Sequence, residues 1–263
     1  MKKYIVLILS LTLLLAGSVS ANKVYPNADG FRPRLEVLEN EYYTTGYCTV
    51  ARNPAWVYYF VKDTPYPDVG ERPSYFSVDR RVNNPVSSDD YTNTGYDRGH
   101  LAPNFILGKV GGLPAQEATF VMTNVIPQDP TLNRGLWKDL EMLIAKTYLK
   151  ENEFMYIFTG PIYDFIPGKP RMQLESGVWI PDWCYKIIVD LDGFEFRVLS
   201  FMFPNKGPYT KLEDYLVSVD VIEKATGLDF LSDLPDSVEF QLEAVIPKTL
   251  WHVRKEDDEV SGN

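Results

Sequence analysis

The sequence predicts a single α+β domain, built from several short strands and at least one amphipathic helix. Hydrophobic residues make up 45% of the chain and aromatic residues 14%, which is enough to bury a large core. The 19 prolines and 17 glycines are scattered among short apolar runs, as expected for many strands joined by loops. No repeat, low-complexity tract or linker divides the chain, so we expect one domain over residues 22–263.

The N-terminal segment has the order of a secretory signal peptide. Lys2 and Lys3 precede an apolar run at residues 4–15, and small residues end in Val19-Ser20-Ala21. The alternative is a retained membrane anchor, but about a dozen apolar residues are too few to span a bilayer comfortably. We therefore expect residues 1–21 to be removed and the mature protein to be secreted or periplasmic.

Cys48 and Cys184 are the only cysteines, and both would remain after cleavage. In an oxidising compartment this favours a disulfide between them. Their distance in the sequence excludes the CxxC spacing of a redox or zinc site. The alternative is two free, buried thiols.

Short apolar runs rich in β-branched and aromatic residues predict five strands. They are "AWVYYFV" (55–61), "TFVMTNV" (119–125), "FMYIFTG" (154–160), "YKIIVDL" (185–191) and "FEFRVLSFMF" (194–203). Asp192-Gly193 lies between the last two and is typical of a hairpin turn, because glycine readily adopts positive φ.

Helical periodicity begins after Gly135. Four apolar side chains share one face at helical spacing, namely Leu136, Leu140, Leu143 and Ile144. This pattern predicts a helix that starts close to Asn133, where asparagine would also serve as an N-cap.

The net charge is −10, and removal of Lys2 and Lys3 would make it −12. An acidic protein is repelled at long range by a polyanion, which argues against a high-affinity nucleic-acid binder. The charge does not exclude an enzyme that contacts phosphate locally.

The segment "GYDRGHLAPN" at residues 95–104 places Asp97, Arg98, Gly99 and His100 side by side. A histidine can accept a proton near neutral pH, and glycine would let the backbone approach a phosphate or a partner strand. A histidine held in a structural hydrogen-bond network is the alternative.

Read with two later segments, this motif resembles the non-specific DNA/RNA endonucleases of the ββα-metal, or His-Me finger, group. The motif is "DRGHLAP" (97–103), and the two later segments are "TNVIPQ" (123–128) and "NRGLWKDLE" (133–141). The likeness continues at residues 46–48, 159–161, 204–205 and 223–230, so it covers most of the mature chain. It implies a central antiparallel sheet with packed helices and a ββα motif that holds His100 and Asn133.

The resemblance implies an exported, Mg²⁺-dependent endonuclease that cuts DNA and RNA with little sequence preference. His100 would be the general base, and Asn133 the one direct protein ligand of Mg²⁺, with Mn²⁺ as an alternative ion. A neutral amide and several waters suit such a hard cation better than zinc. Contacts to phosphate and sugar carry no direct sequence information, which fits the lack of preference.

Three further residues would support catalysis. Arg98 matches the motif arginine and would bind phosphate oxygens, unless it pairs with Asp97 or Glu141. Glu141 would hold a water near the metal or orient Arg98. Asn124 matches an asparagine near the metal in the family.

Other residues near these motifs are less informative. We expect Asp97 to fix its loop and Trp137 to pack in the core. Relatives often carry a phosphate-binding arginine upstream of the histidine, and the sequence does not choose among Arg72, Arg80 and Arg81. We expect no role for His252.

Two alternatives remain open. One is a catalytically inactive, exported binding protein on the same fold, and the other is a phosphodiesterase for small nucleotides, which a −12 protein would repel less. In the main interpretation the partner is nucleic acid, the mature protein does not contact a membrane, and the oligomeric state is not predicted.

Overall fold

The computed structural model describes residue 26 and residues 35–63, 71–152, 154–164, 170–190 and 196–251. The expected signal peptide, the Asp192-Gly193 turn and His252 lie outside these residues. Among the helices of the described ranges, none is long and apolar enough to cross a membrane.

A seven-stranded antiparallel sheet forms the centre of the molecule, in the order β1-β2-β3-β6-β7-β8-β9. The strands are β1 (Glu36–Glu39), β2 (Thr44–Cys48), β3 (Asn53–Lys62), β6 (Phe154–Ile162), β7 (Trp183–Asp190), β8 (Arg197–Pro204) and β9 (Leu216–Val217). Four of the five predicted strands are confirmed as β3, β6, β7 and β8. The central strands β6 and β7 are buried on both faces, which explains their nearly continuous apolar sequences.

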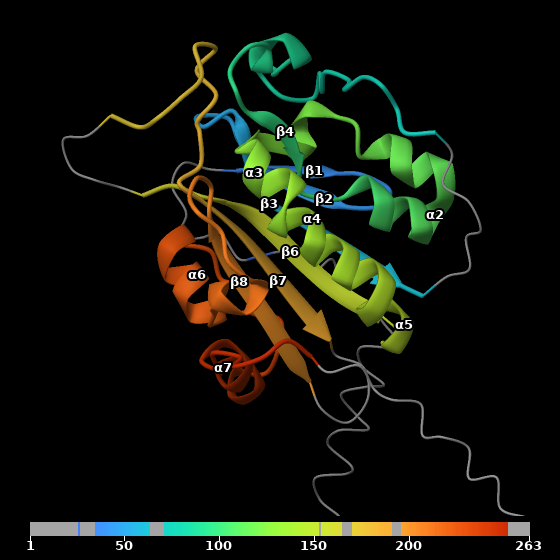
Figure 1. Cartoon of the computed structure of the whole chain (residues 1–263), viewed down its shortest axis with the longest axis vertical. Coiled ribbons are helices and arrows are strands. Elements are labelled where there is room, and N and C mark those ends of the chain that lie inside the picture. The colour runs from blue at the N-terminus through green and yellow to red at the C-terminus, as the bar shows by residue number, and fades with distance from the viewer. Residues whose placement is uncertain are drawn as a thin grey trace, which may run out of the picture.

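The sheet separates two hydrophobic cores, because successive side chains of a strand point to opposite faces. On one face, Tyr59 and Ile188 pack with Leu101, Ile106 and Trp137. On the other face, Trp56 and Ile187 pack with Ile222 and Phe230. Figure 1 shows that the helices between β4 and β6 lie across one face of the sheet.

The described residues also form six α-helices, together with short 3₁₀ helices that include Ser88–Tyr91 and Leu212–Tyr215. The α-helices are α2 (Asn104–Ala118), α3 (Pro130–Arg134), α4 (Leu136–Leu143), α5 (Leu149–Glu151), α6 (Val219–Thr226) and α7 (Asp236–Glu243). A π-helical turn at Ile144–Tyr148 joins α4 to α5. The α+β class predicted from the sequence is confirmed.

A separate two-stranded sheet precedes α3 and completes a ββα unit. Strand β4 (Asp97–His100) pairs antiparallel with β5 (Val125–Gln128), and α3 follows two residues later. A Cβ at Gly99 would lie 2.3 Å from Oε1 of Gln128, so only glycine allows this approach. The glycine therefore accommodates the partner strand, which is one of the two roles expected for it.

The predicted strand at residues 119–125 is wrong. Thr119 ends α2, Met122–Asn124 forms a 3₁₀ turn, and only Val125 belongs to a strand. The physical reason is Asn124, whose buried side chain bonds to the backbone of Ala102 and Thr119 and holds the chain in a turn.

The predicted helix start near Asn133 is also wrong. Helix α3 begins at Pro130, and its N-cap is Asp129, whose carboxylate accepts from the N–H of Thr131 at 2.8 Å. Asn133 therefore lies within α3 and is not an N-cap. Gly135 separates α3 from α4 because its backbone is not helical, with φ of −102° and ψ of −117°. A Cβ there would lie 2.6 Å from the carbonyl oxygen of Thr131, so glycine suits this position.

The expected disulfide is absent, and both cysteines are free, buried thiols. Cys48 packs in the core with Trp56, whereas Cys184 packs in the core on the opposite face of the sheet. Cys48 lies on β2 and Cys184 on β7, and strands β3 and β6 lie between these two strands in the sheet. At about 4.8 Å per strand, the Cα atoms of the two cysteines are roughly 14 Å apart. A disulfide requires less than about 7 Å.

Candidate active site

A cleft of about 790 Å³ opens between the ββα unit and the segment at residues 72–76. Its lining residues are Arg72, Phe76, Tyr96, Asp97, Arg98, His100, Pro103, Asn104, Phe105, Asn133, Arg134, Lys138, Glu141 and Met142. Four of the five predicted site residues, His100, Arg98, Glu141 and Asn133, therefore meet at one cleft.

His100 ends β4 and is only 8% exposed. Its ring lies between Phe76 and Phe120, with centroid distances of 5.0 and 4.9 Å. Nε2 is buried and has no hydrogen-bond partner among the described residues. Burial, together with the positive charge of Arg72, lowers the pKa of His100 to about 3. The ring is therefore neutral at physiological pH, as a general base must be.

Asn133 is oriented by Asp97. Its Nδ2 donates to Oδ2 of Asp97 at 2.8 Å, and Arg134 donates to the same carboxylate at 2.8 and 2.6 Å. Burial raises the pKa of Asp97, but the hydrogen bonds from Arg134 and Asn133 outweigh burial and hold the pKa below its ordinary value. Because the amide nitrogen is used in this way, the carbonyl Oδ1 is the atom available to a cation. A neutral oxygen donor of this kind fits Mg²⁺ or Mn²⁺.

Glu141 lines the cleft from α4, and a lysine lies behind it. Nζ of Lys186, on β7, is 4.0 Å from Oε1 of Glu141 and 4.3 Å from the centre of the Trp137 ring. The Lys186 side chain is completely buried, whereas that of Glu141 is 18% exposed. Trp137 is buried as predicted and donates from its indole nitrogen to the carbonyl of His100 at 3.2 Å.

Sequence reasoning missed Lys186. The available signal was a lysine between apolar residues in the predicted strand "YKIIVDL", because a charged residue inside a buried strand needs a compensating partner. Burial lowers the pKa of Lys186 to about 8, although the negative charge of Glu141 opposes this shift. Burial also raises the pKa of Glu141 to about 7, although the positive charge of Lys186 opposes that shift.

Arg98 is half-buried beside the cleft. Its guanidinium lies 5.8 Å from the ring of Phe76 and 5.9 Å from that of Tyr91, and Nη2 donates to the carbonyl of Ser88 at 2.8 Å. Among the described residues, Arg98 forms no ion pair with Asp97 or Glu141, since these acids contact Arg134 and Lys186. The guanidinium keeps donors for another anion.

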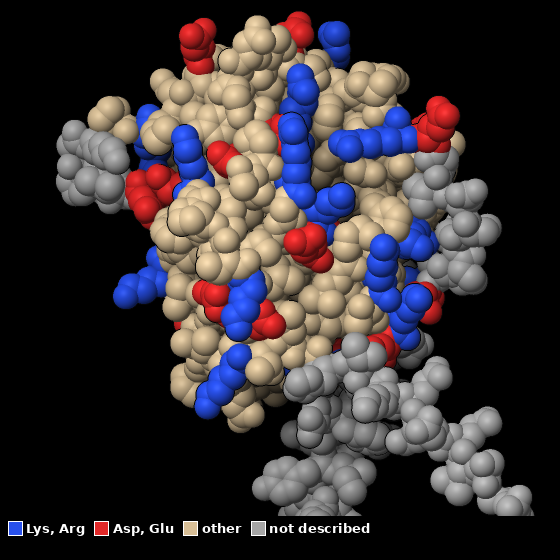
Figure 2. Space-filling view, viewed as in Figure 1, with Lys and Arg blue, Asp and Glu red and all other residues tan. Residues whose placement is uncertain are grey.

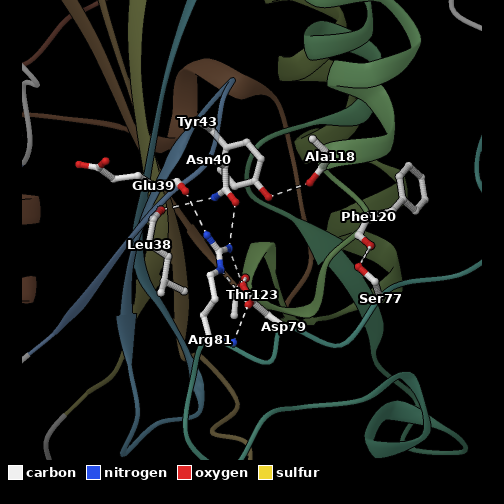
Figure 3. A network of polar contacts seen from close by, with 10 residues as sticks. All are labelled: Leu38, Glu39, Asn40, Tyr43, Ser77, Asp79, Arg81, Ala118, Phe120 and Thr123. Atoms are coloured by element: carbon white, nitrogen blue, oxygen red, sulfur yellow. Dashed lines mark hydrogen bonds and ion pairs between the residues drawn. The ribbon is translucent and has the colours of Figure 1, made fainter.

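The geometry distinguishes the three upstream arginines. Arg72 lines the cleft, and its charge acts on His100. Arg81 instead binds Asp79, the carbonyl of Glu39 and the side chain of Asn40 (Figure 3). Arg80 does not line the cleft.

The contacts in Figure 3 also hold the segment that carries Arg72. Thr123 donates to Asp79 at 2.7 Å, and Ser77 exchanges backbone hydrogen bonds with Phe120 and Met122. Residues 77–81 are thereby attached both to the loop after β1 and to the turn before β5. This attachment fixes Phe76 against His100.

Asn124 lies behind the cleft and does not line it. Its side chain is fully buried, and its three hydrogen bonds to Ala102 and Thr119 measure 2.9 to 3.0 Å. Any effect of Asn124 on catalysis would therefore act through the position of the backbone after His100.

Basic side chains gather around the cleft despite the acidic composition. Four of its lining residues are Arg or Lys, namely Arg72, Arg98, Arg134 and Lys138. Figure 2 shows blue side chains clustered where Figure 1 places α3 and α4. The cleft can therefore attract an anion that the whole chain would repel.

The sequence model of the DNA/RNA non-specific endonucleases matches residues 21–237. The chain belongs to the DNA/RNA non-specific endonuclease family. It is 34% identical over 171 residues to a nuclease of Nostoc sp., covering 61% of this chain and 60% of that one. It is 29% identical over 222 residues to the nuclease of Serratia marcescens, covering 79% of this chain and 80% of the other.

Relatives of this endonuclease family also occur in mitochondria. The human mitochondrial endonuclease G is 29% identical over 162 residues, and 52% of its length is matched. A crystal structure of the EndoG/EndoGI complex superimposes with a TM-score of 0.68 at 25% identity, covering 78% of this chain and 89% of the other. This likeness confirms the α+β fold with a ββα unit. The match spans three fifths or less of the Nostoc nuclease and of human endonuclease G.

Proposed function

We propose that this member of the endonuclease family hydrolyses phosphodiester bonds in DNA and RNA with little sequence preference. The observation that carries the proposal is the convergence of His100, Asn133, Arg98 and Glu141 on one cleft whose other lining includes Arg72, Arg134 and Lys138. Membership of the endonuclease family and the similarity to the Nostoc and Serratia nucleases support this activity.

We assign the proton-accepting role to Nδ1 of His100, because Nε2 is buried without a hydrogen-bond partner among the described residues. In this reaction a water oxygen bonds to phosphorus, its proton passes to Nδ1, and the bond from phosphorus to the departing oxygen breaks. Trp137 supports this geometry because its indole holds the carbonyl of His100.

The basic residues of the cleft bind the substrate. Arg98 lies 5.8 Å from the Phe76 ring and Arg72 lies 5.5 Å from the Phe120 ring, and both of these rings contact His100. The two arginines would hold the phosphate oxygens next to the base. Arg134 and Lys138 extend this positive surface along α3 and α4. Since these contacts involve the phosphate backbone, they carry no direct sequence information.

Asn133 would hold a Mg²⁺ ion, or Mn²⁺, through Oδ1. When bound, such an ion supplies neutralisation of charge on the phosphoryl and departing oxygens. Glu141 faces the same cleft, where it would orient water through its carboxylate. Asp97 keeps the Asn133 amide in place, which is consistent with the structural role expected for it.

We also propose that residues 1–21 are a signal peptide and that residues 22–263 form the endonuclease domain of a secreted or periplasmic protein. The support is the sequence pattern of the N-terminal segment. N-terminal sequencing of the protein recovered outside the cytoplasm would identify the cleavage site, and an uncleaved N-terminus would contradict the proposal.

Cleavage assays test the activity. Plasmid DNA, RNA and a small phosphodiester should be compared, each with Mg²⁺ and with chelator, for the wild type and for His100→Ala. We expect DNA and RNA to be cut in the presence of Mg²⁺ and not in the presence of chelator. The kcat of His100→Ala should be at least about a hundredfold lower than that of the wild type. Hydrolysis of the small phosphodiester alone would indicate a nucleotide phosphodiesterase, and no hydrolysis would indicate an inactive binding protein.

A further inference from the structure

Helices α6 and α7 and the loop between them form the most acidic part of the described chain. Residues 219–245 contain seven acidic residues and one basic residue, Lys224, and so account for −6 of the net charge of −10. None of the seven lines the cleft. The acidic character of the protein is therefore largely a property of this region.

Five of these carboxylates converge. Asp220 and Glu223 are three residues apart on α6, and Glu239 and Glu243 are four apart on α7, so each pair shares a helix face. Asp229 comes from the loop between the helices. Ligand oxygens of Asp220, Glu223 and Glu243 lie within 4.8 Å of one another, and so do those of Asp229, Glu239 and Glu243.

Glu243 belongs to both groups and is the buried member. The residue is only 7% exposed, and its Oε1 has no hydrogen-bond partner among the described residues. Within the same residues, none of the five acids forms an ion pair with a lysine or arginine. A buried carboxylate oxygen without a donor destabilises a fold unless something else satisfies it.

The surrounding backbone holds these acids in place. Gly227 ends α6 with a φ of 75°, which turns the chain back toward the helix. The N–H of Phe230 then donates to Oε1 of Glu223 at 2.8 Å, and Phe230 itself is buried in the core. The loop that carries Asp229 is thus fixed to α6 before any ligand binds.

We propose that Asp220, Glu223, Asp229, Glu239 and Glu243 form a second divalent-cation site, selective for Ca²⁺ and separate from the cleft. Ca²⁺ binds carboxylate oxygens at about 2.3 to 2.6 Å, so two ligands on opposite sides of the ion lie about 4.6 to 5.2 Å apart. Oxygens that lie within 4.8 Å of one another are close enough to contact one such ion. Mg²⁺ is smaller and keeps more of its water, and Zn²⁺ prefers histidine and cysteine.

The competing explanation is a proton shared between Glu223 and Glu243. Burial, together with the charges of Glu223 and Glu239, raises the pKa of Glu243 to about 8. Without a cation, Glu243 would thus be protonated at pH 7. A shared proton alone predicts no response to Ca²⁺, so the two explanations differ in whether Ca²⁺ stabilises the fold.

Thermal unfolding and calorimetry of the full chain would test the site, in an Asn133→Ala background that removes the expected metal ligand of the cleft. Ca²⁺ should raise the unfolding temperature saturably, by about 5 to 10 °C at a hundredfold excess over the dissociation constant. Mg²⁺ should bind more weakly.

Two further substitutions locate the effect. Glu243→Gln keeps the shape of the protonated side chain and should abolish the response to Ca²⁺. Asp233→Asn removes an exposed acid of the same region that belongs to neither group, and it should leave the response unchanged. A wild-type site with no saturable response, or an equal response in Glu243→Gln, would overturn the proposal. In the first case the shared proton would remain as the explanation.

Discussion

Nζ of Lys186 lies 4.0 Å from Oε1 of Glu141, and neither atom has a hydrogen-bond partner among the described residues. The lysine comes from the central strand β7, whereas the glutamate projects from α4 into the cleft. This pair therefore connects the core of the sheet to the candidate active site. Burial favours the neutral form of each group, and their mutual attraction opposes that effect.

Lys186→Met should lower activity by protonating Glu141. Loss of the positive charge raises the pKa of Glu141 further above about 7, so at pH 7 the rate should fall at least about tenfold and recover partly toward pH 9. The check is the pH dependence of kcat/KM. In a Glu141→Gln background the same change should have little further effect, and an equal loss at every pH would indicate that Lys186 is merely structural.

His100 predicts a specific dependence of stability on pH. Its pKa is about 3 in the folded protein and about 6.5 when unfolded, so the unfolded state binds the proton first as the pH falls. The contribution of neutral His100 is therefore complete above pH 6.5 and decreases between pH 6.5 and 3. Between pH 6.5 and 5 the loss should be about 2 kcal/mol.

Denaturant unfolding at these two pH values measures this loss. His100→Asn, which does not titrate in this range, should be less sensitive to pH by the same amount. Equal sensitivity of the variant and the wild type would show that the ring is accessible to protons in the folded protein.

Asn133→Ala should raise the Mg²⁺ concentration needed for half-maximal activity and lower the maximal rate. Asp97→Ala should produce a smaller change in the same direction, because it frees the Asn133 amide without removing its oxygen. Mg²⁺ titrations of activity check both variants. Unchanged Mg²⁺ dependence in Asn133→Ala would exclude it as a ligand.

The two thiols should react only when the protein unfolds. Burial raises the pKa of Cys48, and burial raises that of Cys184 to about 12, so neither forms a reactive thiolate in the folded protein. Alkylation without reductant, followed by mass spectrometry, should modify both cysteines in denaturant and neither in buffer. A linked peptide would contradict the separation of the cysteines across the sheet.

The sequence was sufficient for elements whose pattern is local. Strands β3, β6 and β7 are long apolar runs, and α4 has a clear apolar face, so each could be predicted. Helix α2 could not be, because Gly112 interrupts it with a φ of 70° and Pro114 lies inside it. The turn at Asn124 resembled a strand because its stabilising contacts are to the distant backbone of Ala102.

In the candidate site, too, the residues with a local sequence signal could be predicted, whereas those selected by contacts in the folded chain could not. The DRGH motif identified His100 and Arg98, since their neighbours in the sequence are also their neighbours at the cleft. Choosing Arg72 over Arg81 required the contacts of Asp79 and Asn40, which are made only in the folded chain. Lys186 reaches Glu141 across 45 residues of sequence through the packing of α4 on β7.

The last prediction concerns the salt dependence of substrate binding. The cleft offers four basic residues on a protein of net charge −10, so binding should release few counterions. We expect KM for long DNA to rise with a slope corresponding to roughly two to four phosphate contacts, at about 0.9 per contact, when K⁺ is varied at constant Mg²⁺. Lys138→Ala should reduce that slope by about one contact, whereas Lys224→Ala, an exposed lysine on α6 outside the cleft, should leave it unchanged. A slope equivalent to eight or more contacts would mean that the basic surface extends well beyond the cleft, and that the acidic composition says little about how the protein holds its substrate.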